Sequence, residues 1–197
     1  MSATGSEADG MPMTREQVAK RIAEVALLRG EFTLRSGRKS SYYLDKYLFT
    51  TEPEVLEALG ELFGEVIDRI EDDRAEAGES PIDRLAGAEL GGIPLVTVAA
   101  LFTGFPAVLV RNQKKDYGTS KQLEGKLAQG DTVVFVEDVA TSGGQALEAA
   151  RTLEAAGANV AAILCTVDRQ EGAREAIENA GFRFEALFTK TDLGINE

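Results

Sequence analysis

Residues 133–144 read VVFVEDVATSGG, which is an apolar run, two acids, and then a turn of hydroxyl-bearing residues and glycines. We predict a strand over 132–136, followed by the turn and a helix over 145–156. In an open sheet of parallel strands, ligands bind beyond the carboxyl ends of the strands. Gly143 and Gly144 would let the backbone approach an anion closely, and the dipole of the following helix favours negative charge. The stretch therefore predicts a phosphate-binding turn in an α/β protein.

The rest of the chain continues the alternation of helices and strands. We predict helices over 15–29, 52–70, 93–102 and 172–179, and strands over 85–86, 107–110, 160–167 and 183–188. Residues 31–47 have the composition of strand and turn, 72–80 that of an acidic linker, and 111–125 that of a long loop. This order favours a mainly parallel twisted sheet flanked by helices on both faces. We expect residues 1–13 to form a disordered tail and 14–197 a single domain.

The composition excludes several kinds of chemistry. The chain of 197 residues has a net charge of −12, which argues against a nucleic-acid partner, and it has no apolar run long enough to cross a membrane. It contains no histidine, which excludes Ser-His and Cys-His catalysis and histidine-ligated metals. Its one cysteine, Cys165, lies in an apolar run and is expected to be a buried, inert thiol. Residues 1–14 lack the features of a signal peptide, so we expect a cytoplasmic protein.

Glu137 and Asp138 decide what kind of phosphate ligand the turn could take. Acids beside a phosphate repel it unless they bind something else, such as sugar hydroxyls or hydrated Mg²⁺. A ribose phosphate satisfies both parts of the stretch. In the simpler alternative, Ser142 caps the helix and the acids lie in solvent. That alternative does not explain two acids between an apolar strand and a glycine turn.

The same residues carry a family resemblance. The stretch resembles the phosphoribosyl-pyrophosphate (PRPP) fingerprint of type I phosphoribosyltransferases, whereas the spacings of the Walker A and Rossmann motifs are absent. The resemblance implies the type I phosphoribosyltransferase fold with a small N-terminal hood, mainly over 14–50. It also implies Mg²⁺ held through PRPP and water, with no direct protein ligand. Glu137 and Asp138 would contact the ribose hydroxyls, and further PRPP contacts would come from Val139, Ala140, Thr141, Ser142, Gly143, Gly144 and Gln145.

Residues 111–121 read RNQKKDYGTSK and form a cationic patch in an acidic protein. A solvated loop is the ordinary alternative, but the patch follows a predicted core strand at the ligand-binding edge. It resembles the catalytic loop of orotate phosphoribosyltransferases, although those enzymes usually have a basic residue where Asn112 stands. The resemblance implies a homodimer in which the 111–125 loop serves the neighbouring subunit. It assigns PRPP contacts to Arg111, Lys114, Lys115 and Tyr117, and catalytic roles to Lys115, Arg111 and Asp138.

Residues 32–45 read FTLRSGRKSSYYLD and resemble the orotate-site segment of the same family. The resemblance implies a PRPP contact from Arg35 and an aromatic surface for the base from Tyr42 or Tyr43. An ordinary hairpin with one tyrosine in the core is the alternative. Arg169 follows another predicted strand and could hold the orotate carboxylate through two hydrogen bonds. Orotate contacts are therefore assigned to Tyr42, Tyr43, Thr141 and Arg169.

Residues 87–94 read GAELGGIP and resemble the pyrophosphate loop. Some relatives have a lysine where Gly91 stands, so we expect backbone N–H contacts here. The predicted reaction is phosphoribosyl transfer from PRPP to orotate, which yields orotidine 5′-monophosphate and pyrophosphate in pyrimidine synthesis. Such a displacement needs positioning and charge neutralisation rather than a protein nucleophile. Two alternatives remain open: transfer to another base, such as a purine, and a regulatory module that binds PRPP without transfer.

Overall fold

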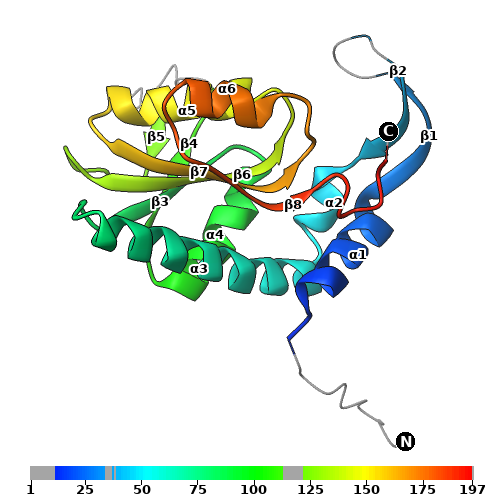
Figure 1. Cartoon of the computed structure of the whole chain (residues 1–197), viewed down its shortest axis with the longest axis horizontal. Coiled ribbons are helices and arrows are strands. Elements are labelled where there is room, and N and C mark those ends of the chain that lie inside the picture. The colour runs from blue at the N-terminus through cyan, green and yellow to red at the C-terminus, as the bar shows by residue number, and fades with distance from the viewer. Residues whose placement is uncertain (1–11, 34–36, 38, 113–121, 197) are drawn as a thin grey trace, which may run out of the picture.

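A six-stranded sheet forms the centre of the molecule (Figure 1). The computed structural model describes residues 12–33, 37, 39–112 and 122–196. All neighbouring strands are parallel except β4 and β5, which are antiparallel, so the predicted α/β fold with a mainly parallel sheet is confirmed. In space the strands follow the order β5 (Leu123–Glu124), β4 (Ala107–Val110), β3 (Arg84–Ala88), β6 (Thr132–Ala140), β7 (Asn159–Asp168) and β8 (Phe184–Thr189).

Helices cover both faces of this sheet (Figure 1). Side chains alternate along β6, so Val134 packs in one core cluster and Phe135 in the other. Because both faces are buried, the strand reads as a continuous apolar run in the sequence. One face carries α3 (Pro53–Glu76) and α4 (Gly92–Thr103), and the other carries α5 (Gly144–Ala155) and α6 (Ala173–Asn179).

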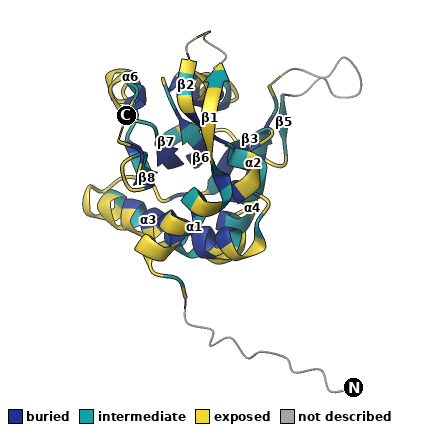
Figure 2. Ribbon diagram, turned by 90° about the vertical axis from the view of Figure 1, so that its right-hand side faces the viewer, coloured by how far each residue is buried: buried dark blue, intermediate teal, exposed yellow. Residues whose placement is uncertain are grey.

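The N-terminal residues form a lobe beside the main sheet. Its elements are α1 (Arg15–Ala26), β1 (Leu27–Thr33), β2 (Lys39–Leu44) and α2 (Lys46–Phe49). β1 and β2 make a separate antiparallel sheet at one end of the molecule (Figures 1 and 2). A capping box between Thr14 and Gln17 starts α1. Buried Val18 and Ile22 of α1 share a core cluster with Phe63 of α3, so apolar packing joins the lobe to the central body.

The first predicted helix and the predicted acidic linker have wrong bounds for physical reasons. The first helix ends at Ala26 rather than 29, because Leu27 adopts an extended conformation and pairs with Leu44 of β2. The predicted acidic linker over 72–80 is wrong in its first half, since α3 continues through its charged residues to Glu76. Gly78, with a positive φ of 70°, follows the end of that helix and lets the chain turn away.

The acid pair lies inside a strand rather than in a turn. β6 continues to Ala140, past its predicted end at 136, so Glu137 and Asp138 belong to the sheet. Two charged side chains interrupt the apolar pattern on which the predicted end depends. α2 and β5 fall outside the prediction because elements of this length give no periodic signal.

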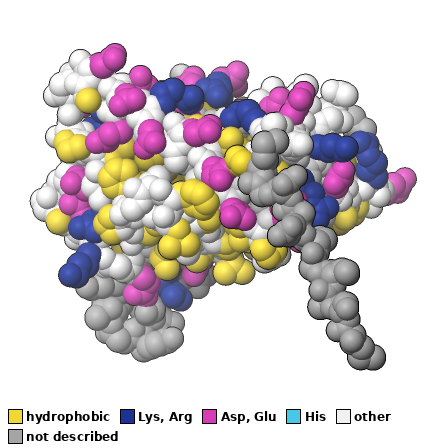
Figure 3. All heavy atoms as spheres, turned by 90° about the horizontal axis from the view of Figure 1, so that it is seen from below, with side chains coloured by type: hydrophobic (Ala, Val, Ile, Leu, Met, Phe, Trp, Pro, Cys, Tyr) yellow, Lys and Arg dark blue, Asp and Glu magenta, His cyan; other side chains and the backbone are white. Residues whose placement is uncertain are grey.

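The face formed by α3 and α4 carries acidic side chains around apolar ones (Figure 3). The large apolar side chains that α4 exposes are Leu101 and Phe102. Among the residues with a described placement, no helix is long and apolar enough to cross a membrane.

Candidate active site

The carboxyl ends of β6 and β7 bring two predicted half-sites side by side. Ala140, at the end of β6, pairs with Asp168, at the end of β7. The backbone N–H of Arg169 donates a hydrogen bond to the Ala140 carbonyl at 2.9 Å. The turn after β6 and the turn that carries Arg169 are therefore neighbours, as expected for adjacent parallel strands.

Glu137 and Asp138 are buried at this edge, with 9% and 2% of their surface exposed. The backbone N–H of Asp138 donates to Glu137 Oε1 at 3.1 Å, and that of Val139 donates to Asp138 Oδ1 at 2.6 Å. Burial, followed by the charge of Asp138, raises the pKa of Glu137 to about 8. Glu137 is therefore mostly protonated at neutral pH and can donate a hydrogen bond. The alternative that places these acids in solvent is wrong.

The turn after β6 leads into α5 without a side-chain cap. Gly143 is the N-cap residue, with a φ of 78°, and no side chain caps the helix. The alternative in which Ser142 acts as the cap is therefore wrong, and Ser142 is exposed. A Cβ on Gly143 would lie 3.1 Å from the Ile177 side chain and 3.2 Å from the Ala173 carbonyl, so glycine is required by both conformation and space.

A small cavity of about 50 Å³ adjoins the acid pair. It brings the predicted residues Arg111, Glu137, Asp138 and Gln145 together with Glu89 of the 87–94 loop and with Lys46, which the prediction missed. The predicted residues Arg35, Lys114, Lys115 and Tyr117 lie outside the described residues.

Lys46 is the main feature that sequence reasoning missed. Its ammonium lies 2.8 Å from Asp138 Oδ2, although it belongs to the N-terminal lobe. Burial lowers the pKa of Lys46, but the charge of Asp138 and its hydrogen bond outweigh this effect, so the pKa is raised. A single lysine at the start of a one-turn helix gives no sequence signal for a partner on a distant strand.

Asn112 connects the start of the cationic stretch to the 87–94 loop. Its backbone N–H donates to Glu89 Oε1 at 2.7 Å, and its side-chain amide donates to the Glu89 carbonyl at 3.2 Å. Arg111 lies 3.9 Å from Glu124, and its buried Nε has no hydrogen-bond partner among the described residues. Asn112 thus holds two segments of the site together.

A second cavity, of about 260 Å³, lies beside Arg169. Arg169 Nη2 donates to the Tyr42 hydroxyl at 3.1 Å, and the guanidinium carbon lies 5.3 Å from the centroid of that ring. Arg169 also pairs with Glu171 at 2.9 Å. Tyr42 is buried and lines the cavity, whereas Tyr43 is exposed and does not line it. The full lining is Lys39, Ser40, Ser41, Tyr42, Arg169, Glu171 and Lys190.

Tyr43 and Thr141 are not among the residues that line this second cavity. The Tyr43 ring lies 5.7 Å from that of Phe32, tilted by 35°. Thr141 is half-buried in the turn after β6. The expectation that one of the two tyrosines belongs to the core is confirmed by Tyr42.

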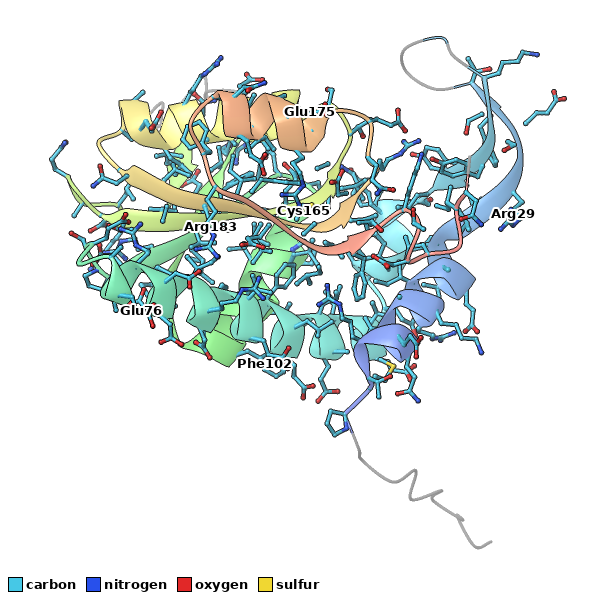
Figure 4. The ribbon with its side chains drawn as sticks, viewed as in Figure 1. Arg29, Glu76, Phe102, Cys165, Glu175 and Arg183 are labelled. Carbon is cyan, nitrogen blue, oxygen red and sulfur yellow. The ribbon has the colours of Figure 1, made fainter. Side chains whose placement is uncertain are left out.

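Cys165, labelled in Figure 4, lies within the central sheet and is fully buried. Burial, with a further contribution from the charge of Asp168, raises the pKa of its thiol well above the usual value. The prediction of a buried, inert thiol is confirmed, because the reactive thiolate is strongly disfavoured here.

The described residues contain no group of three or more acidic or cysteine side chains that could hold a metal ion by themselves. The acid pair and Glu89 nevertheless place carboxyl groups around the first cavity. Such oxygen donors fit a hydrated Mg²⁺ that arrives with a phosphate ligand better than they fit a metal bound by protein atoms alone.

Fold and site together describe a phosphoribosyltransferase, and comparisons with known proteins narrow this class. No protein-family model matches the chain. It is 43% identical to the orotate phosphoribosyltransferase of Halobacterium salinarum over 183 residues, which cover 93% of this chain and 98% of the relative. It is 41% identical to the Pyrococcus furiosus enzyme of the same name over 174 residues, or 88% and 91% of the two chains.

A solved structure gives the same result. The crystal structure of the Mycobacterium tuberculosis orotate phosphoribosyltransferase in complex with PRPP matches with a TM-score of 0.72 and 30% identity. The match covers 92% of this chain and 99% of that one. The chain belongs to the orotate phosphoribosyltransferase family, which confirms the resemblance found in the sequence.

Proposed function

We propose that this protein transfers the phosphoribosyl group of PRPP to orotate, giving orotidine 5′-monophosphate and pyrophosphate in pyrimidine biosynthesis. The observation that carries the proposal is the pair of neighbouring cavities at the ends of β6 and β7. One contains buried acids beside a glycine turn, and the other contains an arginine held by a tyrosine. Two ligands of different chemistry can therefore meet at one edge of the sheet.

The first cavity and the adjoining turn over 141–145 would together bind PRPP. Glu137, when protonated, donates a hydrogen bond, and Asp138 accepts one, so the pair can orient two adjacent ribose hydroxyls. The turn over 141–145 offers backbone N–H groups and two hydroxyls to the 5′-phosphate. Displacement at the anomeric carbon places positive charge on the ribose, which the Asp138 carboxylate favours, and negative charge on the leaving pyrophosphate.

The leaving group requires positive charge. Arg111 lines the first cavity, and Lys115 is assigned with it to the developing pyrophosphate by family resemblance. Arg35, Lys114 and Tyr117 keep their assignment as further PRPP contacts. Mg²⁺ supplies additional neutralisation of the pyrophosphate when it is bound with PRPP.

The second cavity would bind orotate. Arg169 can hold the carboxylate through two hydrogen bonds, and Tyr42 fixes the plane of the guanidinium. Glu171 competes for the same guanidinium, so orotate has to displace or share this partner. Thr141 joins from the neighbouring turn, and Tyr43 remains assigned to the base by resemblance alone.

Further parts of the proposal concern organisation. We infer one domain over 14–197, with the lobe over 14–50 as the hood. The proposed enzyme is a cytoplasmic homodimer that uses the 111–125 loop of each subunit in the site of the other. Sedimentation would test whether the protein is a dimer. Mixing two variants that are each inactive would test the shared loop, since activity is restored only if one subunit completes the site of the other.

A turnover assay tests the proposed reaction. Purified protein with PRPP and Mg²⁺ is offered orotate, uracil, adenine and hypoxanthine, and base consumption is followed. We expect turnover with orotate and little with uracil, because uracil lacks the carboxylate that Arg169 would bind. Preferred turnover of a purine would replace orotate by another acceptor. PRPP binding without turnover of any base would favour a regulatory module.

A further inference from the structure

Lys46 lies in the cavity of the acid pair although it comes from the N-terminal lobe. Two hydrogen bonds of the preceding residue, Asp45, hold the backbone at this point. The Asp45 N–H donates to the Ala26 carbonyl at 2.9 Å, and the Asp45 side chain accepts from the Tyr47 N–H at 3.1 Å as the N-cap of α2. These bonds fix the start of α2 and thereby the base of the Lys46 side chain.

Asp138 is held on both of its oxygens. Oδ1 accepts from the Val139 N–H at 2.6 Å, and Oδ2 pairs with the Lys46 ammonium at 2.8 Å. Gly91 lies close to the same Oδ2, so close that a Cβ on Gly91 would be only 1.8 Å from it. Asp138 is therefore enclosed by the 87–94 loop on one side and by Lys46 on the other.

The positive charge of Lys46 lies at the carboxylate oxygen that Gly91 approaches. Gly91 brings no side chain to the 87–94 loop, and Lys46 delivers an ammonium to the carboxylate oxygen that touches this glycine. The ammonium also interacts electrostatically with Glu137, the acidic neighbour of Asp138. A cation here stabilises the carboxylate of Asp138, which is buried beside a second acid.

The segment 42–46 contacts both half-sites. Tyr42 accepts a hydrogen bond from Arg169 in the second cavity, and Lys46 pairs with Asp138 in the first. Only Tyr43, Leu44 and Asp45 separate these two contacts along the chain. One short segment of the lobe therefore contacts both Asp138 on β6 and Arg169 on the turn after β7.

We propose that Lys46 is a positioning residue of the PRPP half-site, which fixes the Asp138 carboxylate for the ribose through its 2.8 Å ion pair. This inference rests on the proposed function, since it takes PRPP as the ligand of the first cavity. Lys46 acts through Asp138, so its loss lowers PRPP affinity while the orotate cavity keeps its own contacts.

The test compares Lys46→Gln, Lys46→Arg and the wild type for PRPP affinity by calorimetry without orotate. Loss of a charge-assisted contact predicts about a tenfold or greater rise in the PRPP dissociation constant for Lys46→Gln, with substantial rescue by Lys46→Arg. Lys20→Gln is the matched control, because Lys20 of α1 in the same lobe is largely exposed and forms only a 3.9 Å pair with Glu24. If Lys46→Gln fails to fold, Lys46→Met replaces it and keeps the apolar stem.

Two further readouts separate positioning from a general structural effect. We expect the KM for PRPP to rise about tenfold while the KM for orotate changes less than about twofold. In a double-mutant cycle, Lys46→Gln should have little further effect on PRPP affinity once Asp138→Asn is present. Additive losses, or a PRPP affinity within about twofold of the wild type, would overturn the inference. Absence of wild-type turnover would refute the proposed reaction instead, because PRPP affinity is measured separately.

Discussion

Glu137 makes the stability of this protein depend on pH in a direction opposite to that of most carboxyl groups. Burial and the adjacent Asp138 raise its pKa from 4.5 to about 8. An acid whose pKa is higher in the folded state binds its proton more tightly after folding. Its protonation therefore stabilises the fold at low pH, and this stabilisation is lost as the pH rises from the unfolded pKa through the folded one. Glu137→Gln removes the titration and keeps the side chain's size.

The magnitude follows from the two pKa values. Relative to strongly acidic solution, the ionisable side chain loses roughly 1 kcal/mol of stability at about pH 5, roughly 3 kcal/mol at about pH 7 and nearly 5 kcal/mol above about pH 8. Glu137→Gln should lack these losses. The free energy of unfolding of the variant, minus that of the wild type, should therefore increase with pH.

Urea unfolding at a series of pH values measures this difference. Glu65→Gln, on the exposed side of α3, is the control for the same chemical change and should track the wild type. A difference between Glu137→Gln and wild type that stays constant between about pH 5 and about pH 8 would refute the reasoning, because it would mean that Glu137 ionises equally in both states.

Two other substitutions test the cavities. Tyr42→Phe removes the hydroxyl that Arg169 contacts at 3.1 Å, so we expect the KM for orotate to rise about fivefold while the KM for PRPP stays unchanged. Equal changes of the two KM values in steady-state kinetics would contradict this assignment. Gly91→Ala places a Cβ 1.8 Å from Asp138 Oδ2, so the carboxylate must move and PRPP affinity should fall about tenfold or more by calorimetry. Gly64→Ala, where a Cβ meets nothing within 4 Å, should leave affinity unchanged, and an unchanged affinity for Gly91→Ala would contradict the enclosure of Asp138.

The sequence was sufficient for the alternation of elements because that signal is local. The strand over 107–110 has the predicted bounds, since four consecutive apolar residues lie between a glycine-proline turn and a polar loop. The turn after β6 and Arg169 could be placed at one edge because parallel strands align their carboxyl ends. Periodicity and topology therefore predicted that the turn after β6 and the turn that carries Arg169 lie at the same edge of the sheet.

Contacts between distant segments could not be predicted in this way. Lys46 and Asp138 are far apart in sequence, and nothing in the pattern of either segment identifies the other as its partner. The bonds from Asn112 to Glu89 likewise depend on how two loops meet. The sequence indicates a missing cation at Asn112 and predicts backbone N–H contacts at Gly91. The structure shows a connection between two loops at Asn112 and a close approach of Gly91 to the Asp138 carboxylate.

The central claim is that the acid pair and the following turn form the ribose-phosphate half of the site. A crystal structure of the protein with PRPP and Mg²⁺ tests it most directly. The account predicts ribose hydroxyls against Glu137 and Asp138, with the 5′-phosphate in the turn over 141–145. A 5′-phosphate bound elsewhere, with the acid pair making no contact to the sugar, would contradict it.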